Sequence, residues 1–165
     1  MRELEVIGVR VEQPTNQPLV LLREMDPGAS GRRRYLPIWI GAVEASAVAF
    51  AQQGGPSERP PTHELMRSIV EALGDELDEV RIVDVADGVF FASLVFASGT
   101  EVDARPSDSI ALALRAGARI VCAEDVLDAA GLEGNGLDQG EAPDEDAEVA
   151  KFREFLDHVD PEDFG

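Results

Sequence analysis

The segment from Asp103 to Ala113 constrains this chain most, because it joins a short polar strand to a nearly all-apolar helix at a proline. Pro106 suits the first position of a helix, where its missing N–H costs nothing. Three charged residues, Asp103, Arg105 and Asp108, gather at this joint. Charged side chains are rarely buried without partners. We therefore expect either a functional site here or a tightly paired structural joint.

Hydrophobic periodicity predicts two similar halves, each with three strands followed by helices. The predicted strands cover 4–13, 19–25, 35–40, 79–86, 89–97, 100–104 and 119–122. The predicted helices cover 42–53, 62–73, 106–115 and 124–130. Asp87-Gly88 is a strong signal for a two-residue hairpin. The pattern predicts an α+β domain with two antiparallel β-meanders, each followed by helices that pack on the sheet, and an acidic C-terminal helical tail.

The two halves also share a weak internal likeness. A shift of 64 residues aligns 43–50 with 107–114, two Ala-rich segments that each carry one acid in the first helical turn. Ala-rich helices resemble one another by chance, so the likeness alone does not establish a duplication. If the duplication is real, Glu44 and Asp108 hold equivalent places and face each other.

The charge of the chain is uneven. Its formal net charge is −19, and residues 121–165 hold 15 acids and two basic residues. We divide the chain into a domain over 1–131, an acidic Gly-rich linker over 132–147 and an amphipathic helix with tail over 148–165, which docks in cis or binds a protein. Acidity repels polyanions at long range. It counts against nucleic-acid binding by the whole chain, and less against binding by the first 120 residues.

Other features indicate where the protein resides. No apolar run of 18 residues exists, which excludes a typical membrane-spanning helix. The charged start lacks the pattern of a secretory signal. A single cysteine, Cys122, lies in an apolar run and cannot form an internal disulfide. We expect a cytoplasmic protein.

Several charged residues stand at predicted helix starts. Glu44 and Asp108 fall in first helical turns, where a carboxylate favours the helix dipole whether or not it has a chemical role. His63 begins another helix, and the positive helix end favours its neutral form, which can accept a proton, bind a metal or simply cap the helix. Each residue therefore has both a structural and a functional interpretation.

Arginines and one further acid complete the candidate set. Arg105 precedes a proline and is held extended, which suits either a structural ion pair or a phosphate clamp. Asp103 lies on the same predicted strand face as Arg105 and could pair with it. Arg59 and the triple arginine that includes Arg33 and Arg34 could bind phosphate, although such clusters are often only solvated.

Carboxylates, one histidine and arginines suit divalent-metal phosphodiester hydrolysis. Carboxylate oxygens hold Mg²⁺ or Mn²⁺, and the metal activates a water molecule. Arginine offsets the phosphate charge in the transition state. The same residue types are common on ordinary proteins, so this set alone favours the interpretation only weakly.

Three motifs then carry a resemblance to a known family. They are Leu36-Pro37-Ile38-Trp39-Ile40-Gly41 with Glu44-Ala45, Arg59-Pro60-Pro61-Thr62-His63-Glu64-Leu65, and the segment from Asp103 to Ala113. In order and spacing over about residues 4–131, the chain resembles the bifunctional nuclease (BFN) domain family. The resemblance implies an α+β domain, often a homodimer, that cleaves DNA and RNA.

Placing our chemical inference on these motifs gives a definite hypothesis. The predicted catalytic residues are Glu44, His63, Asp103 and Asp108. Glu44, Asp103 and Asp108 are also the candidate ligands of Mg or Mn. The predicted substrate-binding residues are Arg105, Arg59, Arg33 and Arg34. The alternative is a non-catalytic dimeric binding or regulatory module, in which the charged joints pair with one another and stabilise the fold.

Overall fold

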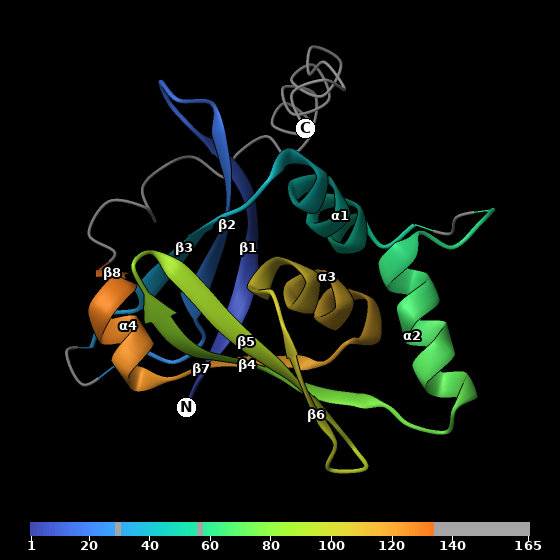
Figure 1. The fold of residues 1–165 in the computed structure, drawn as a ribbon. Coiled ribbons are helices and arrows are strands. Elements are labelled where there is room, and N and C mark those ends of the chain that lie inside the picture. The colour runs from blue at the N-terminus through green and yellow to red at the C-terminus, as the bar shows by residue number, and fades with distance from the viewer. Residues whose placement is uncertain (29–30, 56–57, 134–165) are drawn as a thin grey trace.

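The computed structural model describes residues 1–28, 31–55 and 58–133. Within these residues eight strands form one mixed sheet accompanied by four helices (Figure 1). The strands are β1 (Arg2–Glu12), β2 (Gln17–Glu24), β3 (Arg34–Trp39), β4 (Leu77–Ala86), β5 (Val89–Phe96), β6 (Glu101–Ala104), β7 (Arg119–Cys122) and β8 (Leu132–Glu133). The helices are α1 (Ala42–Gln53), α2 (Thr62–Ala72), α3 (Pro106–Ala116) and α4 (Glu124–Ala130).

The sheet consists of the two predicted meanders joined by one strand. Its order is β6-β5-β4-β7-β1-β2-β3-β8, and the strands within each meander are antiparallel. Strand β7 lies between the meanders, parallel to β4 and antiparallel to β1. The predicted α+β fold, a single domain with two meanders followed by helices, is confirmed.

Helices α1 and α3 pack against each other and against the sheet, which they help to bury (Figure 1). The largest fully buried side chains come from both meanders and from the helices, and include Leu22, Leu36, Ile82, Ile110, Leu112 and Leu127. The same core holds Cys122, and burial raises the pKa of its thiol to about 12. That thiol is therefore a packing group at neutral pH.

Helix α2 differs from the others because none of its residues is buried. It contacts α3 and projects beside it (Figure 1). The apolar side chains of Leu65, Ile69 and Leu73 recur every four residues and are 47%, 49% and 81% exposed. An amphipathic helix of this length draws its stability from packing of the apolar face. In the described part of the chain this apolar face is left uncovered.

Local sequence explains where the helices that frame the site begin and end. Gly54 and Gly117 end α1 and α3 with positive φ angles of 64° and 71°, a conformation that favours glycine. Pro106 begins α3, as predicted. Thr62 is the first residue of α2, as predicted, and Pro61 occupies the cap position without a side-chain hydrogen bond. Pro61 presets the extended backbone that precedes a helix.

The structure describes only the first two residues of the linker that we predicted over 132–147. Residues 132 and 133, which we assigned to the acidic linker, form β8 and pair with β3. The remainder of the linker and the helix predicted over 148–165 lie outside the described residues. No helix of the described ranges is long and apolar enough to cross a membrane.

Candidate active site at three helix starts

The first turns of α1, α2 and α3 bring Glu44, His63 and Asp108 together around Arg105. Glu44 is the third residue of α1, His63 the second of α2 and Asp108 the third of α3. Arg105 occupies the cap position directly before α3, where its extended backbone (φ −69°, ψ 142°) precedes Pro106. We name these four residues the junction cluster. The structure thus joins residues separated by up to 64 positions.

Hydrogen bonds connect the junction cluster in a line. His63 Nε2 lies 3.2 Å from Asp108 Oδ1. Arg105 donates from Nε to Asp108 Oδ2 at 2.8 Å and from Nη1 to Glu44 Oε1 at 3.0 Å. Both oxygens of Asp108 therefore have partners, one on each side.

The electrostatics of the junction cluster follow from these contacts. Burial raises the pKa of Asp108, but the hydrogen bonds from Arg105 and His63 outweigh it, so the pKa of this carboxyl lies below its ordinary value. The hydrogen bond to Asp108 also raises the pKa of Arg105. Because Asp108 is ionised at neutral pH and accepts hydrogen bonds, the facing Nε2 of His63 must carry the proton. The lone pair of the neutral imidazole is then on Nδ1.

Exposure differs along the line of contacts. The side chain of His63 is 14% exposed, that of Asp108 33%, and that of Arg105 65%. Within the described residues, His63 has no second side-chain hydrogen bond, and no side-chain nitrogen or oxygen is buried without a partner. Nδ1 of His63 and the Arg105 guanidinium can therefore both be reached from solvent.

Gly41 shapes the position of Glu44. A Cβ atom at Gly41 would fall on Oε2 of Glu44, which folds back over the start of its own helix. The backbone of Gly41 (φ −74°, ψ 164°) is one that any residue adopts. Glycine at this position therefore gives space to the carboxylate and does not relieve backbone strain.

Asp103 lies outside the junction cluster. It pairs with Ser93 along the edge strand β6 and is exposed, and its side chain makes no hydrogen bond or ion pair with the described part of the chain. We expected Asp103 and Arg105 to share a strand face. Arg105 instead follows the end of β6, and its guanidinium turns to Asp108 and Glu44.

Arg34 is held in a structural network on another part of the molecule. Its guanidinium donates to Glu24 at 2.8 and 3.0 Å, and to Glu124 and Asp128 of α4 at 2.5 and 2.7 Å. Glu24 is fully buried and also accepts from Arg2 at 2.9 Å. Arg34 begins β3 and the junction cluster follows the end of β3, about 20 Å away for six strand residues. The geometry gives Arg34 a folding role.

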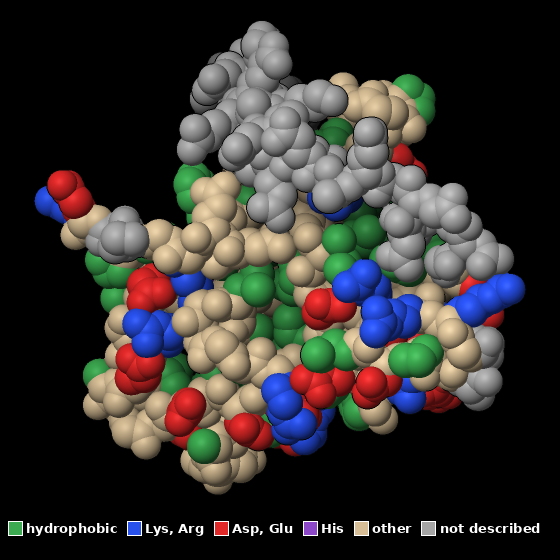
Figure 2. Space-filling view, turned by 180° about the vertical axis from the view of Figure 1, so that it is seen from behind, with side chains coloured by type: hydrophobic (Ala, Val, Ile, Leu, Met, Phe, Trp, Pro, Cys, Tyr) green, Lys and Arg blue, Asp and Glu red, His purple; other side chains and the backbone are tan. Residues whose placement is uncertain are grey.

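The other predicted arginines lie at the surface. Arg33 is exposed beside Arg34, before β3, while Arg59 is exposed in the link four residues before His63. Figure 2 shows that basic and acidic side chains lie next to one another on the face seen there, around an apolar middle. Of the four predicted substrate-binding arginines, the structure places Arg105 in the junction cluster and Arg59 in the link that leads to it.

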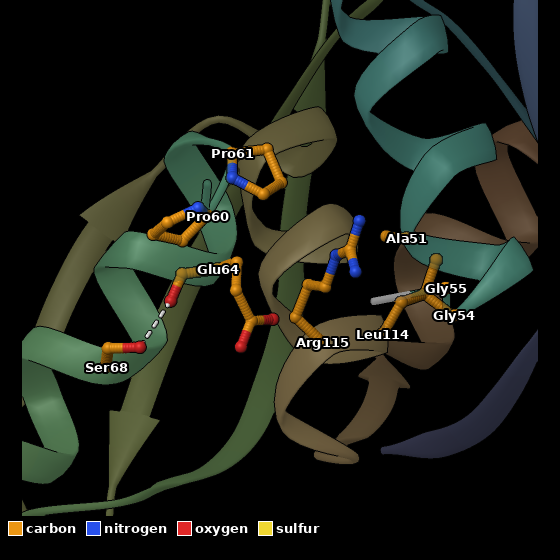
Figure 3. A pocket seen from close by; sticks show the side chains of 9 residues that line it. All are labelled: Ala51, Gly54, Gly55, Pro60, Pro61, Glu64, Ser68, Leu114 and Arg115. Carbon is orange, nitrogen blue, oxygen red and sulfur yellow. Dashed lines mark hydrogen bonds between the residues drawn. The ribbon is translucent and has the colours of Figure 1, made fainter. Parts of the chain in front are cut away.

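A hollow of about 550 Å³ adjoins the start of α2. Figure 3 shows Glu64 reaching from α2 toward α3, and Arg115 pointing from α3 toward Ala51 of α1. Arg115 is not among the residues that we predicted for the site. Its spacing could have indicated it, because it lies seven residues after Asp108 and therefore on the same side of α3.

The predicted metal ligands do not gather into one centre. No group of three His, Cys, Asp or Glu side chains is placed to hold a metal ion within the described ranges. Glu44 and Asp108 approach each other, but the Arg105 guanidinium lies between their carboxylates. The donor set in this arrangement does not fit the predicted three-carboxylate centre.

Comparison with known proteins agrees with the fold and the motifs. Residues 20–135 match the family model of the bifunctional nuclease domain. The chain belongs to the bifunctional nuclease domain family. It is also 53% identical over 170 residues to "Uncharacterized protein Rv1829" of Mycobacterium tuberculosis strain H37Rv and to "Uncharacterized protein MT1877" of strain CDC 1551. In each case the match covers 99% of this chain and 98% of the relative. Membership of the family points to a nuclease-like function.

Proposed function

We propose that this protein hydrolyses phosphodiester bonds in DNA and RNA, and that the junction cluster is its reacting centre. The observation that carries the proposal is the His63–Asp108–Arg105 contact line, in which a proton acceptor and a cation that can bind phosphate share one carboxylate. Family membership supports the same activity.

The geometry suggests a role for each residue. His63 Nδ1 removes a proton from a water molecule, whose oxygen forms a bond to phosphorus as one ester P–O bond breaks and the leaving oxygen takes a proton from solvent. Asp108 holds Nε2 in its protonated form and stabilises the imidazolium that results, as an orienting carboxylate does in other histidine-based sites. Arg105, which is exposed, turns its free N–H groups to the phosphate oxygens.

Glu44 acts through Arg105. Its carboxylate accepts a hydrogen bond from Nη1 of Arg105 and so restricts the orientation of the guanidinium. Glu44 is therefore a positioning residue in this proposal. We derive no step through a metal ion, because Arg105 separates the two carboxylates that would share it. Activity with Mg²⁺, with Mn²⁺ and with a chelator tests the expected metal directly.

We further propose that the protein works as a homodimer in the cytoplasm. The uncovered apolar face of α2 supports the first part, because two copies of a regular apolar stripe can cover each other across a two-fold axis. The single buried cysteine supports the second part, because disulfide frameworks are typical of secreted proteins.

A second candidate function is a dimeric binding module without catalysis. The observation that favours it is that Arg105, Asp108 and Glu44 satisfy one another, as they would in a purely structural joint. This reading predicts that removing the His63 side chain leaves any activity of the preparation unchanged.

One experiment separates the two functions. Purified protein is incubated with labelled single-stranded DNA and RNA, with each metal and with chelator, beside the variants His63→Gln and His158→Gln. His158 is the only other histidine of the sequence and lies outside the described residues. The nuclease proposal expects cleavage by the wild type and by His158→Gln, and a loss of about 100-fold or more in His63→Gln, the range of acid–base catalysis. Absence of cleavage in every condition, or equal cleavage by all three proteins, would support the binding module.

A further inference from the structure

The hollow between the ends of α1 and α3 and the start of α2 has the size and lining of a ligand subsite. Its volume of about 550 Å³ falls within the roughly 300–1,000 Å³ usual for small-molecule sites. Pro60, Pro61 and Leu114 give it apolar surface, and Arg115 and Glu64 are its charged groups. At Gly54 and Gly55 an added Cβ would meet no atom of the described residues within 4 Å, so the described residues leave this side of the hollow open.

Arg115 is a basic residue of this hollow that forms no ion pair with the described residues. It makes no hydrogen bond or ion pair with the described part of the chain, and its positive charge helps to lower the pKa of Glu64. Glu64 itself is bound mainly by Arg67, whose hydrogen bond is the principal cause of that lowered pKa. The acidic group that lines the hollow with Arg115 is therefore already paired with another arginine.

Arg115 is aligned with the junction cluster. Asp108 and Arg115 are seven residues apart on α3, which corresponds to about two turns and about 10 Å along the helix axis. Neighbouring phosphates of one strand lie farther apart than the axial rise of about 3.4 Å per nucleotide, because each step also turns around the helix axis. A nucleic-acid strand whose scissile phosphate lies at Arg105 would therefore present another phosphate near Arg115, about one or two nucleotides away.

We propose that this hollow is a subsite for the nucleotides that flank the scissile bond, with Arg115 as the residue that binds their phosphate. The apolar prolines would contact a sugar or base without reading its identity, which is expected of a site that accepts both DNA and RNA. This inference rests on the proposed nuclease function.

The first test is the salt dependence of binding by the full chain. The probe is a fluorescent single-stranded oligonucleotide, whose affinity is measured by anisotropy from low to moderate salt for the wild type, Arg115→Ala and Arg119→Ala. Arg119 is an exposed arginine of α3's neighbour β7 that pairs with Glu79, so its removal makes the same charge change elsewhere. Loss of one phosphate contact lowers the slope of log K against log salt by about 0.7 for a single strand. We expect this change in Arg115→Ala alone, and an equal slope in all three proteins would overturn the proposal.

The second test fills the hollow without changing its charge. Gly55→Trp places a large side chain at its open side, and Gly55→Ala is the matched control. We expect Gly55→Trp to raise KM for an oligonucleotide about tenfold and to leave hydrolysis of bis(p-nitrophenyl) phosphate, which reaches only the junction cluster, unchanged. An unchanged KM in Gly55→Trp would refute the subsite. If neither substrate is cleaved by the wild type, the nuclease function fails, and the salt test still decides whether the hollow binds a strand.

Discussion

Glu44 and Asp108 occupy the same place in two different helices, and the Arg105 guanidinium joins their carboxylates at 3.0 and 2.8 Å. Each is the third residue of its helix, and each helix follows a three-stranded meander. The residue equivalent to Arg105 at the start of α1 is Gly41, under the same shift of 64 positions. The two halves thus place their acidic residues at equivalent positions in the structure. They differ at the residue before the helix, where arginine in the second half contacts both carboxylates and glycine in the first half leaves room for Glu44.

Gly41 offers a mild way to disturb this arrangement. In Gly41→Ala the added Cβ would displace the Glu44 carboxylate, while the backbone conformation remains acceptable to alanine. Arg105 then loses one charge-assisted hydrogen bond, a change of about 1.5 kcal/mol. We expect kcat/KM for an oligonucleotide to fall about tenfold, with the midpoint of urea unfolding nearly unchanged.

The matched control for this variant is Gly28→Ala, where the added Cβ meets only a backbone oxygen at ordinary contact distance. Equal activity in the two alanine variants would mean that the position of Glu44 does not matter for cleavage.

The two aspartates of the Asp103–Ala113 segment give a sharper test. Asp108→Asn removes the carboxylate that orients His63, and we expect a loss of about 100-fold or more in kcat. Asp103→Asn changes an exposed residue of the edge strand that lies outside the contact line. We expect its activity to stay within about twofold of the wild type. Single-turnover cleavage of one labelled oligonucleotide measures both, and a greater loss in Asp103→Asn would restore the original three-acid hypothesis.

Much of the fold could be predicted from the sequence, because its strands and helices show clear hydrophobic periodicity and are bounded by glycine and proline residues. Asp87-Gly88 turns β4 into β5, and Pro106 starts α3, as expected. The short pairing of β8 with β3 could not be anticipated, because Leu132 and Glu133 sit at the start of a Gly- and acid-rich stretch. Their strand conformation depends on the edge that β3 provides.

The site was predictable where the residues share one type of position, the first turn of a helix. Glu44, His63 and Asp108 are predicted on that basis, and the structure brings their side chains together around Arg105. The pairing of Arg34 with Glu24 could not be predicted, because Glu24 belongs to the neighbouring strand and cross-strand pairing is not visible in a run of three arginines. The position of Arg115 beside a hollow could not be predicted, because the hollow is formed by residues of three helices that are distant in the sequence.

The exposed apolar side chains of α2 form the face through which we propose that two copies associate. Ile69→Gln and Leu73→Gln together replace two exposed apolar side chains of that face without adding charge. If two copies cover each other through α2, the variant should elute as a monomer where the wild type is a dimer, as measured by light scattering after size exclusion. Val89→Gln, which changes an equally exposed apolar residue on β5, serves as control. A monomeric wild type, or a variant that stays dimeric, contradicts this interface.

The buried carboxylate of Glu24 makes the fold sensitive to acid. Burial opposes its ionised form, but hydrogen bonds from Arg34 and Arg2 outweigh burial and lower its pKa from 4.5 to about 2. A carboxyl with a lowered folded-state pKa stabilises the fold fully above its unfolded value, and this stabilisation is lost as the pH falls from about 4.5 toward 2. The difference corresponds to roughly 3 kcal/mol. We expect Glu24→Gln to be destabilised by about that amount at pH 7 in urea unfolding, and to lose less stability than the wild type on acidification. Parallel losses in the two proteins between pH 5 and pH 2 would show that another group controls the acid response, because the glutamine has no proton to gain.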